Sequence, residues 1–157
     1  MNVADAIALR RSIRAFEGRA VGEEKLKRVL EAGRLSPSGN NGQKRKFVVV
    51  RDKRTREKLV KAAGNQTFVG QAPVVIVACG EIVDVIIALD HMTLQAVEEG
   101  LGTCWIGFFT EADVRKLLGI PDAVHVVALL PVGYPAENPE ARPRNPIEEC
   151  VCFEKYR

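Results

Sequence analysis

The sequence lacks any apolar run long enough to cross a bilayer. Its longest apolar stretches, residues 73–79 and 124–132, are much shorter than the roughly 20 residues that a membrane-spanning helix needs. The N-terminus also lacks the succession of basic, apolar and small residues that makes a signal peptide. We therefore expect a cytoplasmic protein that has no membrane partner.

Cysteine and histidine are both scarce. The four cysteines are Cys79, Cys104, Cys150 and Cys152. They lie in or beside apolar stretches, where thiols behave as small buried hydrophobes of a reducing compartment, so we expect no disulfides. The C-x-C spacing of the last two has no second Cys or His pair nearby, which gives a zinc or iron–sulfur site little support. His91 and His125 fall inside expected apolar elements without a serine or cysteine partner, so both are interpreted as structural.

An excess of one charge is also missing. The 23 basic and 20 acidic residues leave a net charge of +3, which creates no general field for nucleic acid. The length of 157 residues and the hydrophobic content of 46% are those of one soluble globular unit, and no internal repeat is evident. We expect a single domain over residues 1–157.

Hydrophobic periodicity predicts helices and strands that mix without strict alternation, as in an α+β fold. Helices are expected at residues 2–10 (capped by Asn2), 21–35, 53–63, 83–99 and 111–118 (capped by Thr110). Strands are expected at residues 47–50, 73–79 and 125–132. Five prolines between positions 131 and 146 predict an extended arm, followed by a terminal strand at residues 149–153.

Two basic clusters stand near the ends of the chain. Residues 10–14 place three guanidinium groups and the Ser12 hydroxyl just past the first helix, a donor set able to hold a phosphate. The alternative is a solvated basic surface, which is the usual fate of such a run. Arg142 and Arg144 lie in the proline-rich arm, where prolines reduce the entropy lost when the arginines are fixed on a ligand.

Two further segments are candidates for ligand contact. The polar loop at residues 36–43 has amides and backbone groups that could bind the edge of a heterocycle, although an ordinary surface turn would look similar. Residues 100–107 combine glycines, which let a backbone approach a ligand closely, with Trp105 and Ile106 as apolar contacts. The alternative here is a helix end followed by a core strand.

Taken in order, these segments resemble the nitroreductase family of flavin enzymes over nearly the whole chain. Residues 10–16 match its R-R-S-x-R-x-F pattern and residues 36–43 its A/S-P-S-x-x-N-x-Q loop. The apolar strand beginning Ala-Pro at residue 72 and the G-L-G-T-x-W-I-G motif at residues 100–107 follow. Gly-Tyr-Pro at residues 133–135 and the basic pair at 142 and 144 complete the series.

The resemblance implies a central, mostly antiparallel mixed sheet flanked by helices. It also implies a homodimer, joined through the long central helix, with the C-terminal arm reaching the partner and the active sites at the interface. The cofactor would be FMN. The contacts implied by the family are Arg10, Arg11, Ser12, Arg14, Arg142 and Arg144 at the phosphate and ribityl chain; Pro37, Ser38, Gly39 and Asn41, from the partner, over the ring; and Trp105, Ile106 and Gly107 behind the flavin, with one N–H directed at N5.

The implied reaction is ping-pong. NADH or NADPH reduces the flavin and leaves, and a small acceptor such as a nitroaromatic or quinone is then reduced, without a catalytic side chain. The same scaffold carries dehalogenation, flavin breakdown and azoline oxidation, so these stay open, as do an FMN-binding redox sensor and a flavin-storage dimer. A basic nucleic-acid module is a further alternative, but exposed aromatics are not interleaved with the arginines.

Two departures from the family pattern bear on the substrate. Gln43 is followed by three basic residues, 44–46, where relatives often have Pro-Trp or Pro-Glu. The connection before the central helix is only residues 81 and 82, which implies a minimal member with a more open cleft. The sequence leaves the acceptor and the choice between NADH and NADPH undetermined.

Overall fold

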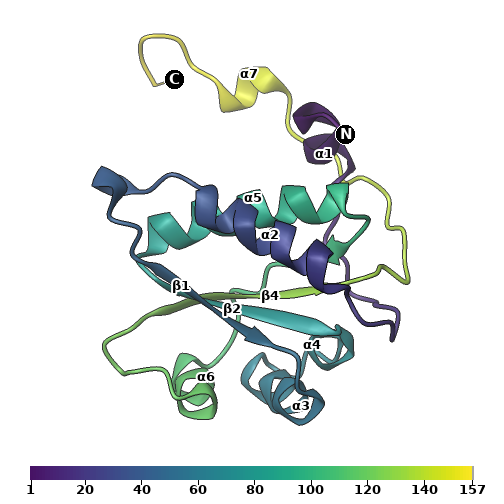
Figure 1. Cartoon of the computed structure of the whole chain (residues 1–157). Helices are drawn as coiled ribbons and strands as arrows, with labels where there is room; N and C mark the ends of the chain where they lie inside the picture. Colours follow the sequence, from purple (N-terminus) through teal and green to yellow (C-terminus); the bar gives the residue numbers. More distant parts are fainter. Residues whose placement is uncertain (157) are drawn as a thin grey trace.

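The computed structural model describes residues 1–156, which form helices around a four-stranded sheet (Figure 1). The strand order is β1-β2-β4-β3, and every neighbouring pair is antiparallel. A parallel bridge between Ser12 and Thr103 lengthens the β3 edge and makes the sheet mixed. The predicted α+β class with a mostly antiparallel sheet is therefore confirmed. The strands are β1 (Arg45–Val50), β2 (Val74–Gly80), β3 (Gly102–Thr103) and β4 (Val126–Gly133).

Helices cover both faces of the sheet. Figure 1 shows α2 (Glu23–Leu35) and α5 (Ile82–Glu98) on one face, and α3 (Lys53–Ala62), α4 (Phe68–Gln71) and α6 (Glu111–Leu118) on the other. The β-branched sequence of β2 suits this sandwich because successive side chains point to opposite faces. Val74 and Ile76 pack in the cluster with α2 and α5, whereas Val75 and Val77 pack in the cluster with α3 and α6.

The central helix α5 is anchored at its C-terminal end. At its C-terminus, Gly100 adopts φ 70° and the Leu101 N–H bonds the Ala96 carbonyl at 2.8 Å, so the predicted glycine stop is confirmed. The buried Glu99 carboxylate then accepts two hydrogen bonds from Arg28 of α2, at 2.6 and 2.8 Å. These bonds hold the pKa of Glu99 below its ordinary value, although burial opposes the shift.

The first helix, α1 (Val3–Leu9), lies against the C-terminal half of α5. Asn2 caps it as predicted, since its side-chain oxygen accepts the Asp5 N–H at 2.9 Å. The N-terminal ammonium group lies 3.1 Å from Glu98, near the end of α5. The segment that follows α1 is thereby positioned beside the β3 edge of the sheet.

The predicted terminal strand at residues 149–153 is wrong. The chain instead forms a short helix, α7 (Ile147–Cys150), in an arm that lies away from the sheet in Figure 1. A strand needs a neighbouring strand for its hydrogen bonds, and none is near this segment among the described residues. Cys150 and Cys152 belong to this arm and are exposed, which corrects the expectation of buried thiols. Cys79 and Cys104 are buried, as expected.

Two smaller expectations, for Thr110 and His125, also need correction, and the place of Pro131 is defined. Pro131 falls in both the strand and the arm that the sequence predicts, and it lies inside β4. Residues two apart in a strand direct their N–H groups to the same side. Leu129 bonds Ile106, so the backbone nitrogen of Pro131 also faces the β3 side, where a proline is tolerated because β3 is only two residues long. Thr110 stands at the N-cap of α6, but its side chain makes no capping bond. His125 precedes β4 with its side chain 73% exposed, 3.6 Å from Glu111, so it is not a core histidine.

Among the helices of residues 1–156, none has the length and apolar character needed to span a membrane.

Candidate functional site

The two basic clusters from opposite ends of the chain line one cavity of about 390 Å³. One wall is the end of α1 with the segment after it, and the other is the proline-rich arm. All six predicted phosphate-site residues contribute to the lining: Arg10, Arg11, Ser12, Arg14, Arg142 and Arg144. The structure therefore brings together groups that are about 130 positions apart in the sequence.

Pairing with the β3 edge positions the first basic cluster. The Ile13 N–H donates to the Thr103 carbonyl at 2.9 Å, and Ser12 forms the parallel bridge to Thr103. This close approach requires a glycine at position 102, because a Cβ there would lie 2.6 Å from Cγ1 of Ile13. Gly102 thus makes room for the chain itself, whereas the sequence suggested that glycines here make room for a ligand.

A short ladder carries the second basic cluster to the same place. The Glu17 N–H bonds the Tyr134 carbonyl and the Ala136 N–H bonds the Ala15 carbonyl, each at 2.9 Å. The Glu137 carboxylate extends this ladder by accepting the Arg14 N–H and, at 3.1 Å, the Ala15 N–H. Glu137 could not be predicted from the sequence, since one acid among prolines carries no recognisable signal.

The cavity concentrates arginines that form no salt bridges. Within residues 1–156, no carboxylate pairs with any of its five arginines, and Glu140 is the one acidic residue in the lining. Arg28, Arg34, Arg51 and Arg115, elsewhere in the chain, all have carboxylate partners. Guanidinium groups gathered without partners favour an anion, and their fork geometry suits phosphate oxygens.

The stretch after β3 divides into exposed and buried positions. Ile106 is buried, and both its N–H and its carbonyl bond Leu129, at 2.9 and 3.0 Å. Its N–H is therefore not available to a flavin, and alternation along the edge turns the N–H groups of Trp105 and Gly107 away from β4. Both residues are exposed, and a Cβ at Gly107 would meet nothing within 4 Å. Of the three predicted N5 donors, Trp105 and Gly107 remain.

Cys104, next to this stretch, is not activated as a nucleophile. Its side chain is buried, and burial raises the pKa of the thiol more than the nearby Arg14 and Arg10 lower it. The thiol thus stays protonated at neutral pH, and the thiolate is the reactive form. The site offers positive charge and backbone donors rather than a nucleophilic side chain.

The loop at residues 36–43 does not line the cavity of about 390 Å³ described above, here called the arginine cavity, within the same chain. Its Gly39 N–H bonds Asp84 in the first turn of α5, whereas α1 lies near Glu98 at the other end of that helix. The 17 residues of α5 span about 25 Å at 1.5 Å per residue. Pro37, Ser38, Gly39 and Asn41 are therefore far from the arginines of their own chain.

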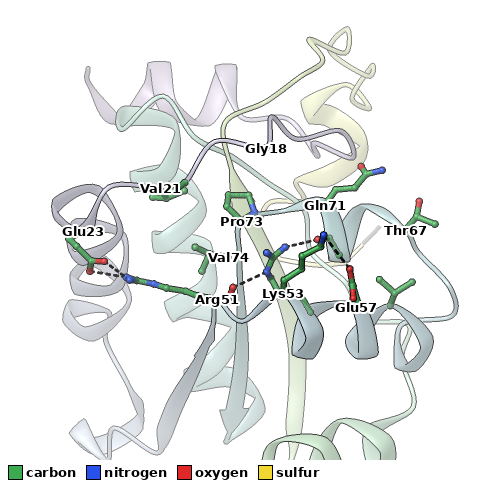
Figure 2. A pocket seen from close by; sticks show the side chains of 14 residues that line it. Gly18, Val21, Glu23, Arg51, Lys53, Glu57, Thr67, Gln71, Pro73 and Val74 are labelled. Carbon is green, nitrogen blue, oxygen red and sulfur yellow. Dashed lines mark hydrogen bonds and ion pairs between the residues drawn. The ribbon is translucent and has the colours of Figure 1, made fainter.

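A larger cavity, of about 900 Å³, lies elsewhere and is shown in Figure 2. Its charged groups are already engaged: Arg51 pairs with Glu23, and Lys53 lies 3.9 Å from Glu57. Arg56 donates to the carbonyls of Gly70 and Ala72, each at 2.5 Å. We assign the site by its unpaired charge rather than by volume, so the smaller arginine cavity is the candidate.

Known proteins resemble this chain in both sequence and fold. A family model described as "Nitroreductase family" matches residues 7–81 and 62–134. An inferred NADH dehydrogenase/NAD(P)H nitroreductase of Methanothermobacter thermautotrophicus is 35% identical, over 90% of this chain and 82% of its own length. FMN reductase [NAD(P)H] of Bacillus subtilis is 30% identical, over 93% of this chain and 71% of its own. The structure of NADPH:FMN oxidoreductase from Vibrio harveyi complexed with NAD+ superposes with a TM-score of 0.95 at 29% identity, covering 100% of this chain and 79% of that one.

Proposed function

Because the chain belongs to the nitroreductase family and is an FMN-dependent NAD(P)H oxidoreductase, we propose that it reduces a small nitroaromatic, quinone or similar acceptor in a ping-pong reaction. NADH or NADPH serves as the reductant. The observation that supports the site most strongly is the arginine cavity, in which two distant basic clusters converge without carboxylate partners.

The residues of the cavity fit the phosphate end of FMN. A phosphate with two negative charges would accept hydrogen bonds from Arg10, Arg14, Arg142 and Arg144, whose four positive charges more than offset it, with the Ser12 hydroxyl as a further donor. Arg11 is the most tightly held of the five arginines, because its Nη1 donates to the carbonyls of Ala8 and Arg10 at 2.7 and 2.9 Å, whereas the Arg144 Nη1 bonds to its own arm are longer, at 3.1 and 3.2 Å. We infer that Arg11 shapes the end of α1 and adds positive charge rather than a direct contact.

The protein itself would orient the flavin and cover its ring. When bound, FMN supplies the redox chemistry, taking a hydride from the nicotinamide and passing electrons to the acceptor. The outward N–H of Trp105 or Gly107 would hold the ring edge, and the Trp105 side chain, 37% exposed, offers apolar surface beside it. No side-chain nucleophile takes part in this scheme.

A homodimer completes the proposed site. The loop at residues 36–43 binds the N-terminal end of α5, a helix about 25 Å long, whereas α1, which leads into the arginines, lies at the other end, so the loop would cover the flavin of the partner subunit. Apolar side chains are exposed along the surfaces that would meet: Ile82, Val83 and Ile86 of α5, Val3 and Ile7 of α1, and Ile147 and Phe153 of the arm. Exposed apolar surface of this kind is typical of protein interfaces.

The visible spectrum tests the cofactor and the reductant together. Protein supplied with FMN is expected to retain a yellow flavin after gel filtration and to bleach when NADH or NADPH is added without oxygen. Repeated turnover with a quinone or nitrofuran acceptor distinguishes an enzyme from a sensor or storage protein, which would be reduced by only one equivalent. A protein that stays colourless with excess FMN contradicts the proposal.

Sedimentation equilibrium tests the dimer. Two chains of 17.3 kDa are expected to remain associated at micromolar concentration. A mass of one chain, measured while FMN is bound, would contradict a shared site.

A further inference from the structure

Asp84 is a buried carboxylate that faces a loop rather than its own helix. It lies in the first turn of α5 and is 6% exposed. Its Oδ1 accepts the Gly39 N–H at 3.2 Å, and its Oδ2 accepts the Lys44 N–H at 3.1 Å. Both oxygens therefore bind backbone at the two ends of residues 39–44.

The bracketed loop has a costly backbone conformation. Asn40, Asn41 and Gln43 have φ values of 49°, 54° and 51°, in the left-handed region, which asparagine tolerates better than most residues and glutamine does not. Such conformations persist where the surroundings impose them, and they concentrate at functional sites. One hydrogen bond within the loop stabilises this conformation, since the Ser38 Oγ accepts the Gln43 N–H at 3.0 Å. Asp84 supplies the attachment of this loop to the core.

Arg45 fixes the entry to the same loop. Its Nη2 donates to the carbonyls of Arg34 and Ser36, at 2.9 and 2.7 Å, and so holds the end of α2. Two side chains, one cation and one carboxylate, thus anchor the loop and the segment that leads into it. Of these, Asp84 is the one that binds residues within the predicted flavin cover.

We propose that Asp84 is a positioning residue, which holds residues 39–44 in the conformation that covers the flavin ring in the partner subunit. The inference rests on the proposed function, because the cover is meaningful only if FMN binds. It assigns a role to a side chain that touches neither the arginine cavity nor the stretch at Trp105. The carboxylate acts through the loop backbone and takes no part in the chemistry.

The variant Asp84→Asn tests the contact with little change of shape. One carboxylate oxygen becomes an N–H₂ group that faces an N–H donor, so at least one of the two bonds is lost. In FMN-free protein, hydrogen exchange at residues 39–44 is expected to accelerate about tenfold or more, as loss of a charge-assisted hydrogen bond implies. With FMN, we expect the flavin absorption and circular dichroism to shift toward free FMN, and the KM for the acceptor to change.

Asp113→Asn is the matched control. Asp113 is an exposed acid in the first turn of α6, so its replacement removes the same charge from an equivalent helix position. It is expected to leave loop exchange, flavin spectrum and KM as in the wild type.

If Asp84→Asn does not fold, Gly39→Pro tests the same contact from the loop. The proline ring removes the Gly39 N–H, while α5 and its carboxylate stay intact, and a Cβ at Gly39 would meet nothing within 4 Å. Faster exchange at residues 41–44 is expected.

The outcomes separate the two proposals. Wild-type protein that takes up no FMN overturns the proposed function, although the exchange data still report on the Asp84 contact. Wild-type protein that binds FMN overturns the Asp84 assignment alone if the variant keeps wild-type loop exchange, or loosens the loop without changing the spectrum and KM.

Discussion

Replacing Arg10 with alanine is expected to weaken FMN binding about 10- to 150-fold. The range follows from roughly 1.5 to 3 kcal/mol for a charge-assisted contact to one phosphate. Arg144→Ala should have a similar effect from the other wall of the cavity, since both side chains line the same space. Because the two arginines would share one phosphate, the double variant is expected to depart from additivity. Fluorescence titration of apoprotein with FMN measures all three affinities.

Arg54→Ala is the control for this series. Arg54 is an exposed arginine on α3, outside the cavity, and its loss lowers the net charge by the same amount. Its FMN affinity should match the wild type. Equal affinities in the Arg10, Arg144 and Arg54 variants would show that the arginine cavity does not hold the phosphate.

Gly102→Ala is expected to destabilise the protein and to impair FMN binding at once. The added Cβ would lie 2.6 and 2.9 Å from two atoms of Ile13, which is buried in the core, so the segment after α1 must move. Overpacking of this kind costs about 1 to 3 kcal/mol, equivalent to a loss of roughly 3 to 10 °C in Tm for a chain of this size. Because Ile13 lies between Ser12 and Arg14, the same shift displaces the phosphate donors.

Calorimetry and FMN titration of Gly102→Ala measure the two effects separately. Gly18→Ala is the matched control, because a Cβ at Gly18 would meet nothing within 4 Å. An unchanged melting temperature and FMN affinity in Gly102→Ala would show that the β3 edge does not position the basic cluster.

The parts of the fold that could be predicted were those with strong local patterns. The β-branched run of β2 and the apolar α5 with its glycine stop are examples, since burial on both faces and helix termination are visible in the residues themselves. β3 is only two residues long and α4 only four, so their existence depends on neighbours rather than on a pattern. The terminal segment formed α7 instead of a strand for the same reason.

The residues of the candidate site could be predicted from the sequence, but the residues that hold them in place could not. The arginines and the polar loop are conspicuous in the sequence, whereas the residues that position them look ordinary. Gly102 resembles a helix-end glycine, Glu137 a surface acid and Asp84 an acid that favours a helix N-terminus. Their roles depend on contacts across 40 to 123 positions of sequence, which no local pattern reveals.

Titration of the wild-type apoprotein with FMN and with riboflavin, in parallel, tests whether the arginine cavity binds the flavin phosphate. The two ligands differ only in that phosphate. FMN is expected to bind at least about 100-fold more tightly than riboflavin, since several charge-assisted contacts depend on that group. Equal affinity for the two flavins would show that the arginine cavity does not bind the phosphate.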